Sequence, residues 1–198
     1  MSKLRQDFTT ITWVMIPVAI AINIAIGTLI YAIKFPFVYL DMIGTVLVGV
    51  LCGPWAGLLT GLLSNLIWGL SGLNPVYTPY FIVGGVIGFL AGWFSQWGWF
   101  TSWWKSIVAG AITGVAAAAL SAPITAYLYG GVTGAGTDVL TAFFRALGFE
   151  NLAANFIQGL AVDPLDKAVT FLIVFLIIRL LPFRFVARFP RGENIRKT

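Results

Sequence analysis

The chain has 198 residues, of which 59% are hydrophobic and only 10% are charged, and its mean hydropathy is +0.93. A soluble domain carries roughly a quarter charged residues, so the composition excludes an ordinary soluble protein and indicates an integral membrane protein. The formal net charge is +5. Most of the excess Lys and Arg lies near the termini, and this distribution is better explained by the orientation of the chain in a membrane than by nucleic-acid binding. One cysteine, Cys52, excludes an intrachain disulfide, and the chain has no histidine to serve as a transition-metal ligand.

Six apolar segments are candidates for membrane spans, since about 20 residues cross ~30 Å of hydrocarbon. We expect spans at about residues 11–33, 38–52, 55–70, 80–94, 106–129 and 164–181. They predict an all-α, polytopic six-transmembrane-helix bundle that forms a single domain over residues 1–198. The second span is short, and whether it crosses the membrane fully is left open.

Two further features of these segments bear on packing and depth. The first span contains Ala21 and Ala25, small residues four apart that let another helix approach closely. The loop from Trp93 to Lys105 contains five tryptophans, which is typical of a segment at the level of the lipid headgroups.

Residues 130–162 form the one long stretch without a spanning pattern. It opens with a Gly-rich run, and the apolar residues of its first helical pattern share one face: Leu140, Phe143, Phe144 and Leu147. A second short pattern covers residues 152–160. These patterns predict a long amphipathic external segment between helices 5 and 6, which lies on the membrane surface or covers the bundle as a lid.

The sixth span is expected to begin at Asp163. Asp163 as N-cap, Pro164 at the first helical position and Asp166 in the first turn form a helix-start signal. A strongly basic tail follows the span.

The distribution of basic residues predicts the orientation. Six spans place both termini on one side, with these basic residues: Lys3, Arg5, Lys105, Arg184, Arg188, Arg191, Arg196 and Lys197, with Arg179 near its edge. The other side has Lys34, Arg145 and Lys167 but also Asp41, Asp138, Glu150, Asp163 and Asp166. The Lys/Arg excess marks the cytoplasmic face, so we expect both termini inside.

Polar and aromatic residues collect near the predicted external ends of the spans. The candidate substrate-binding residues are Asp41, Asn65, Trp68, Tyr77, Tyr80, Asn155, Gln158, Asp163, Asp166 and Lys167. A polar group in hydrocarbon costs several kcal/mol, so such residues are expected to face the bundle interior or a cavity.

Each of these residues also has a structural interpretation. Asp163 and Asp166 could serve as helix caps without binding a ligand, and Asp163 could form an i,i+4 ion pair with Lys167. Asp41 could be the N-cap of the second span, and Asn65 could make a hydrogen bond between helices. Tyr77 and Tyr80 could belong to an aromatic belt. Their convergence on one end of the bundle favours a small site that opens outward.

Enzyme motifs are missing from the sequence. There is no His-containing acid/base pair, no P-loop and no dense aspartate motif for metal-bound head groups. We therefore expect no catalytic residues, no metal and no cofactor, and energy for any uphill transport must come from another protein.

In the order and spacing of several motifs, the chain resembles the substrate-binding (S) component of energy-coupling factor (ECF) type ABC importers of prokaryotes. They are the Ala21/Ala25 pair, Phe35-Pro-Phe-Val-Tyr-Leu-Asp41, Gly53-Pro-Trp-Ala-Gly57, Asp163-Pro-Leu-Asp166-Lys167 and Leu181-Pro182 before the basic tail. The resemblance implies six helices that capture a vitamin, nucleobase or related micronutrient at the outer face of the prokaryotic cytoplasmic membrane.

The resemblance also implies partners and a mechanism. A membrane coupling subunit and two cytoplasmic ATPases would drive uptake, with Ala21 and Ala25 meeting the coupling subunit and the whole component toppling in the bilayer. The long segment 130–162 departs from compact vitamin binders. Two alternatives remain, a membrane-embedded small-molecule sensor and an enzyme acting on lipid precursors.

Overall fold

The computed structural model describes residues 3–195, which form helices and no strand. The all-α expectation is therefore confirmed over that range. The elements in chain order are α1 (Lys3–Asp7), α2 (Thr10–Ile33), α3 (Ile43–Cys52), α4 (Pro54–Leu70), the 3₁₀ helix η1 (Pro75–Tyr80), α5 (Phe81–Gln96), the 3₁₀ helix η2 (Trp99–Thr101), α6 (Trp103–Leu128), α7 (Asp138–Ala146), α8 (Asn151–Leu180), α9 (Phe183–Val186) and α10 (Gly192–Ile195).

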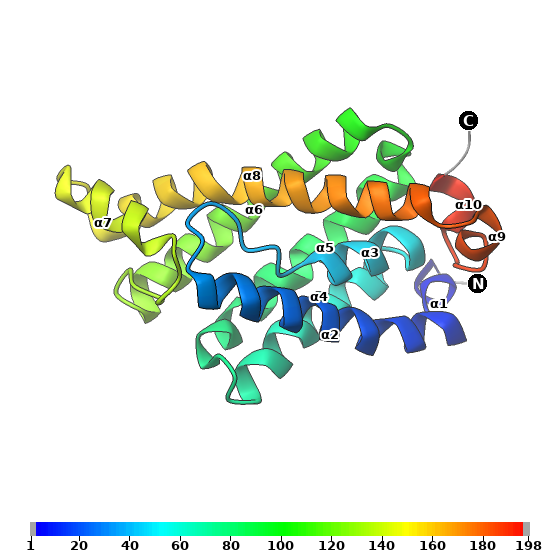
Figure 1. Ribbon diagram of the computed structural model, residues 1–198, viewed down its shortest axis with the longest axis horizontal. Helices are drawn as coiled ribbons and strands as arrows, with labels where there is room; N and C mark the ends of the chain where they lie inside the picture. The colour runs from blue at the N-terminus through cyan, green and yellow to red at the C-terminus, as the bar shows by residue number, and fades with distance from the viewer. Residues whose placement is uncertain (1–2, 196–198) are drawn as a thin grey trace.

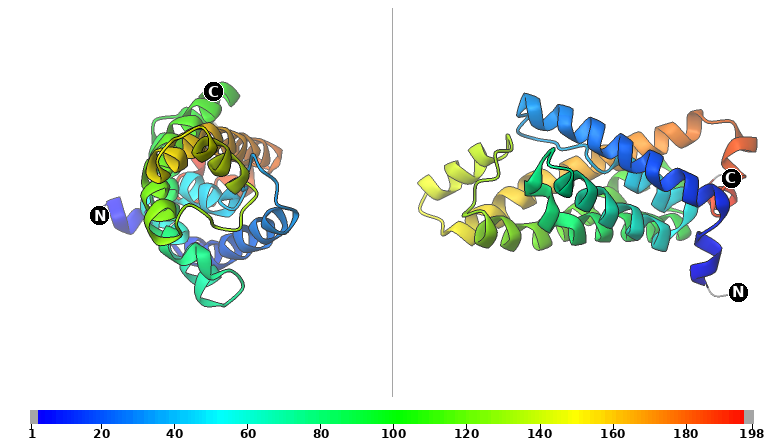
Figure 2. Two further views of the ribbon diagram at one scale, coloured as in Figure 1. Left: turned by 90° about the vertical axis from the view of Figure 1, so that its left-hand side faces the viewer. Right: turned by 90° about the horizontal axis from the view of Figure 1, so that it is seen from below.

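The long helices run roughly along one axis and surround the short helix α3 (Figures 1 and 2). All ten residues of α3 are buried. At 1.5 Å per residue the helix is only ~15 Å long, about half of the hydrocarbon thickness. It begins at Ile43 rather than near residue 38, because the preceding residues form a loop in which Leu40 has a positive φ of 51°. The helix is the centre of the core.

Three segments are long and apolar enough to cross a membrane: Thr10–Ile33, Pro75–Gln96 and Trp103–Leu128. Large apolar side chains are exposed on their outer faces, including Trp13, Val14, Leu29, Ile82, Val108, Ile112 and Val115. Exposed apolar surface of this extent is unusual for a soluble monomer and is compatible with a membrane protein. The count of six spans stays a prediction.

Glycines let α3, α4 and α5 approach with their backbones nearly in contact. A Cβ added at Gly57 would lie 2.7 Å from the Cα of Gly49, and one added at Gly84 would lie 2.6 Å from the carbonyl oxygen of Gly61. Real Cβ atoms do not come so close, so only glycine fits these positions. The glycines of these three helices thus allow close helix packing.

The predicted helix start at Asp163 is wrong. Helix α8 runs without interruption from Asn151 to Leu180, with Pro164 inside it, so residues 151–162 are not a separate surface helix. Proline is tolerated within helices of this kind. The backbone of α8 at Asp163 and Pro164 packs directly on Gly114 of α6, and this tertiary packing outweighs the local start signal.

The first and last helices lie at the same end of the bundle, opposite α7 (Figure 1). Arg191 holds this end together, because its Nη2 lies 2.7 Å from Oδ1 of the buried Asp7 and its backbone N–H donates to the Leu51 carbonyl. The other carboxylate oxygen of Asp7 accepts the Trp55 N–H at 3.2 Å. The predicted membrane orientation itself stays a prediction.

Candidate functional site

A cavity lies toward the end of the bundle opposite the termini, and it is lined by polar and aromatic side chains. Its volume is about 100 Å³. A polar cavity of this size has room for several waters or for a small molecule. Its walls come from α2, α4, η1, α5, α6, α8 and the loops before α3 and α7.

Seven of the ten predicted binding residues line this cavity: Asp41, Asn65, Tyr77, Tyr80, Gln158, Asp163 and Lys167. The other three, Trp68, Asn155 and Asp166, are buried behind the wall. Residues that are far apart in the sequence therefore meet at one place, as the convergence at the helix ends predicts.

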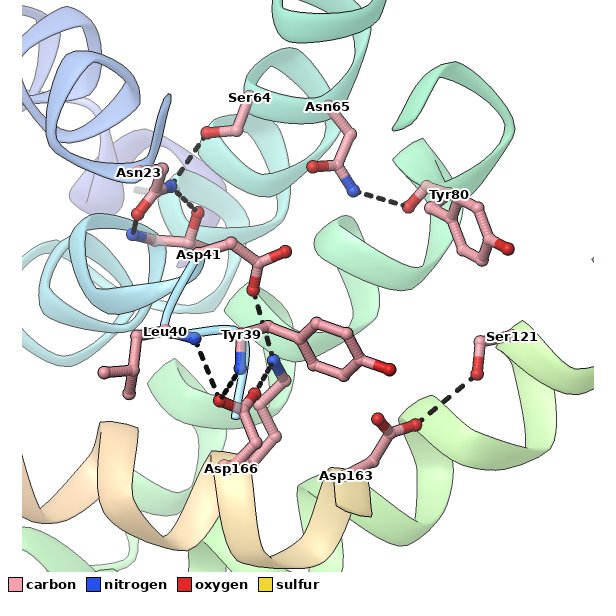
Figure 3. Close-up of polar contacts among 12 residues, drawn as sticks. Asn23, Tyr39, Leu40, Asp41, Ser64, Asn65, Tyr80, Ser121, Asp163 and Asp166 are labelled. Carbon is pink, nitrogen blue, oxygen red and sulfur yellow. Dashed lines mark hydrogen bonds and ion pairs between the residues drawn. The ribbon is translucent and has the colours of Figure 1, made fainter. Parts of the chain in front are cut away.

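Asp166 anchors the loop that precedes α3. Its Oδ1 accepts the backbone N–H groups of Tyr39 at 2.8 Å and Leu40 at 2.9 Å, and its Oδ2 is paired with Lys167 (Figure 3). Asp166 is fully buried, so the carboxylate is well compensated by two N–H donors and one ammonium. Asp166 shapes the site without lining it.

Lys167 bridges two carboxylates from different parts of the chain. Its Nζ lies 3.4 Å from Oδ1 of Asp41 in addition to its pairing with Asp166. Its ion-pair partners within residues 3–195 do not include Asp163, so the predicted i,i+4 pair is wrong. Asp41 is not an N-cap either, because the N-cap position of α3 is Met42, whose own side chain makes no capping hydrogen bond.

Asp163 and Lys167 are four residues apart on α8 and so share one face of the helix, and Asp163 points toward Ser121 of α6 (Figure 3). The Ser121 hydroxyl donates to its Oδ2 at a long 3.4 Å, and the residue is 6% exposed. A carboxylate this buried is normally compensated by a cation or by several donors. Asp163 has far less compensation than Asp166.

Asn65 forms the opposite part of the wall. Its Nδ2 donates to the Tyr80 carbonyl at 2.9 Å, whereas its Oδ1 finds no hydrogen-bond partner among the described residues. The predicted hydrogen bond between helices therefore exists, but it uses only half of the amide. The Tyr80 hydroxyl is held by Thr125 of α6 at 2.7 Å.

Aromatic rings line the remaining surface. Tyr77 stacks on Trp68 with ring centroids 3.7 Å apart, and Tyr80 stacks on Tyr129 at 6.2 Å. Trp68 is 1% exposed, so it supports Tyr77 from behind. Neither tyrosine acts only as a belt residue at a lipid interface.

Asn155 and Gln158 differ in role although both are on α8. Asn155 donates to the carbonyl of Asn151 at 2.8 Å and lies outside the cavity lining. Gln158 lines the cavity, and its Nε2 has no hydrogen-bond partner within the described part of the chain.

Two tyrosines that sequence reasoning missed tie the loops together over the cavity. The Tyr31 hydroxyl donates to the Thr133 carbonyl, and the Tyr39 hydroxyl donates to Thr137, both at 3.0 Å. These bonds join α2 and its following loop to residues 133–137, about a hundred positions later. The lid predicted over residues 130–162 is thus in contact with the site through its first residues.

Asp138 also lines the cavity, but its carboxylate is used within the loop. Its Oδ2 accepts the N–H groups of Thr133 at 3.0 Å and Gly134 at 2.7 Å, and its Oδ1 accepts the Thr133 hydroxyl at 2.9 Å. The turn-forming composition of this stretch is a signal that could have pointed to such a cap.

The arrangement suits binding of a small polar molecule. Among the residues that the structure describes, no group of three or more metal-ligating side chains is arranged to hold a metal ion. Ala21 and Ala25 are outside the cavity lining and are exposed on α2. Comparisons with known protein families, with curated proteins and with solved structures find no match to this chain.

Proposed function

We propose that this chain captures a small molecule in the polar cavity and delivers it across the prokaryotic cytoplasmic membrane as the S component of an ECF-type importer. The observation that carries the proposal is the cavity itself. Seven of the residues predicted to bind a ligand, all polar or aromatic, line this cavity in an otherwise apolar bundle. The cavity lies toward the end of the bundle away from the basic termini. Polar and ionisable groups within an apolar bundle are costly, so those that are present commonly mark a functional site.

The proposed topology follows the distribution of charge. The bundle has six membrane segments, the termini with α9 and α10 are cytoplasmic, and the cavity with α7 is external. The role needs partners, a membrane coupling subunit and two cytoplasmic ATPase subunits, because the chain carries no nucleotide-binding motif. The site residues bind rather than catalyse, so the chain is not an enzyme.

Two measurements test this role. Mass spectrometry of the gently purified protein is expected to detect a bound small molecule, and a tagged chain is expected to co-purify with the coupling and ATPase subunits of its source cell. Turnover of a lipid precursor by the purified chain would instead show that the protein is an enzyme. Co-purification with a signalling protein and without ATPases would favour the sensor alternative.

The exposed small residues of α2 lead to a prediction that distinguishes docking on the coupling subunit from binding of the small molecule. Ala21→Leu with Ala25→Leu is expected to reduce uptake about tenfold or more, since overpacking a close helix contact costs ~1–3 kcal/mol. Both residues are exposed, so stability and ligand retention should change little. The measurement is radiolabelled uptake in cells beside ligand retention by purified protein.

The matched control is Ala119→Leu, the same change at an exposed alanine of α6. Its uptake is expected to equal that of the wild type. Uptake unaffected by the Ala21/Ala25 pair of changes would remove the proposed docking role of this face.

A further inference from the structure

The charges around the cavity do not balance. Three carboxylates line it, Asp41, Asp138 and Asp163, and a fourth, Asp166, lies directly behind. Among the lining residues, which all belong to the described part of the chain, Lys167 is the one cation. Its ammonium is already shared between Asp166 and Asp41. The cavity and the wall behind it therefore hold four carboxylates and one ammonium.

Asp163 carries the excess. Asp166 is compensated by two N–H groups and Lys167, Asp41 by Lys167, and Asp138 by donors within its own loop. Among the described residues, Asp163 receives only the long hydrogen bond from Ser121. An isolated buried carboxylate is unfavourable, and a cation placed beside it offsets part of that cost.

Two buried amide groups that point into the same cavity independently indicate a ligand. Asn65 is 2% exposed and its Oδ1 is without a partner among the described residues. Its orientation follows from its other contact, because the Tyr80 carbonyl can only accept and so must face the NH₂ group. A ligand in the cavity must therefore offer a donor to Asn65, on the far side from Asp163 (Figure 3).

The second amide is Gln158. It is 7% exposed, lines the cavity and has an unpartnered Nε2 among the described residues. This NH₂ group can donate to an acceptor atom or to the face of an aromatic ring of a bound molecule. Buried amide groups without partners are rare in folded proteins, and here two of them converge on one empty volume.

The aromatic lining suits a positive charge as well. Four tyrosine rings border the cavity, those of Tyr31, Tyr39, Tyr77 and Tyr80. Tyr39 already lies 5.8 Å from the ammonium of Lys167, and Tyr77 is fixed by its stack on Trp68. The faces of such rings attract cations, most strongly where water is excluded.

We infer that the molecule captured in this cavity is a small organic cation that bears at least one further N–H or O–H donor. The inference rests on the proposed capture function and specifies its substrate class. The positive group lies at Asp163 beside Ser121, a second donor reaches Asn65, and the tyrosine rings enclose the body of the molecule. A singly positive ligand reduces the carboxylate excess, whereas an anion would increase it.

The test is equilibrium dialysis of the full-length protein in nanodiscs against a protein-free small-molecule extract of bacterial cells. Retained compounds are identified by mass spectrometry and sorted by their charge at neutral pH. Competition with benzamidinium, benzamide and benzoate, which have nearly the same shape but charges of +1, 0 and −1, then measures the charge preference. We expect the retained compounds to be cations, and benzamidinium to compete best.

Asp163→Asn is the decisive variant, because it keeps the shape of the side chain and removes its charge. It is expected to lower retention of the cations about 30-fold or more, in line with the loss of one partner of a buried charge pair. Glu150→Gln is the control, since Glu150 is an exposed carboxylate outside the cavity lining, and it should retain cations like the wild type. The unfolding temperature of each variant shows that the bundle is intact.

The outcomes separate the inference from the function on which it rests. Retention of neutral or anionic compounds by the wild type would overturn the cation assignment and leave capture standing. Undiminished retention of cations by an intact Asp163→Asn protein would overturn the role of Asp163. If the wild type retained nothing from the extract, the capture function would fail and the inference with it.

Discussion

Asp166→Ala is expected to destabilise the protein by about 3–5 kcal/mol, the effect of removing one partner of a buried ion pair. The carboxylate of Asp166 accepts two backbone N–H groups of the loop before α3 and pairs with Lys167. Alanine leaves these two donors unpaired and leaves the buried Lys167 with only Asp41, at 3.4 Å. The measurement is chemical or thermal unfolding of the purified protein in detergent.

The same substitution should also release the loop. Leu40 has a positive φ of 51°, a conformation that a branched residue adopts only when its surroundings hold it there. Trypsin cleavage after the exposed Lys34 should therefore become faster in Asp166→Ala than in the wild type.

Asp166→Asn provides the matched control for this prediction. It keeps a carbonyl oxygen that can accept the Tyr39 and Leu40 N–H groups, but it removes the charge that faces Lys167. Its stability and its cleavage rate should lie between those of the wild type and Asp166→Ala. An alanine variant that unfolded within about 0.5 kcal/mol of the wild type, with unchanged cleavage at Lys34, would contradict the anchoring role.

The long helices are predictable from the sequence because apolar length is a local property. The segment predicted at residues 11–33 is α2 at Thr10–Ile33, and the one at 106–129 is α6 at Trp103–Leu128. The start of α8 is not predictable in this way. Asp163 and Pro164 form a valid local start signal, but the packing of α8 on Gly114 depends on a helix about fifty residues earlier.

The candidate site shows the same division. The types and positions of Asp41, Asn65, Asp163 and Lys167 are visible in the sequence, and their presence at the ends of apolar segments predicts that they meet. Their pairing is not visible. The sequence offers Asp163, four residues away, as a partner of Lys167, whereas in the folded chain Lys167 pairs with the adjacent Asp166 and with Asp41, which is 126 residues away.

Tertiary structure also decides how α3 is capped. The sequence offers Asp41 as an N-cap, but the acceptor comes from Asn23 in the middle of α2. The Oδ1 of Asn23 accepts the Gly44 N–H at 2.7 Å, within the first turn of α3 (Figure 3). The first N–H groups of a helix have no partner within the helix itself, so a side chain from a neighbouring helix can replace a local cap.

Asn23→Ala is expected to destabilise the protein by about 3 kcal/mol for this reason. Asn23 is fully buried, and its Nδ2 also donates to the hydroxyls of Thr45 at 2.7 Å and Ser64 at 2.9 Å. Hydrogen bonds between membrane helices contribute ~0.6–1.7 kcal/mol each, and an orphaned buried N–H costs ~1–3 kcal/mol. Unfolding in detergent measures the loss.

Thr28→Ala is the control, because Thr28 is an exposed polar residue of the same helix, and it should change stability by less than about 0.5 kcal/mol. A similarly small change in Asn23→Ala would show that water or another side chain replaces the amide. The beginning of α3 immediately follows Asp41 and Met42 in the cavity wall. Loosening α3 should therefore weaken retention of the captured molecule as well, although Asn23 lies outside the lining.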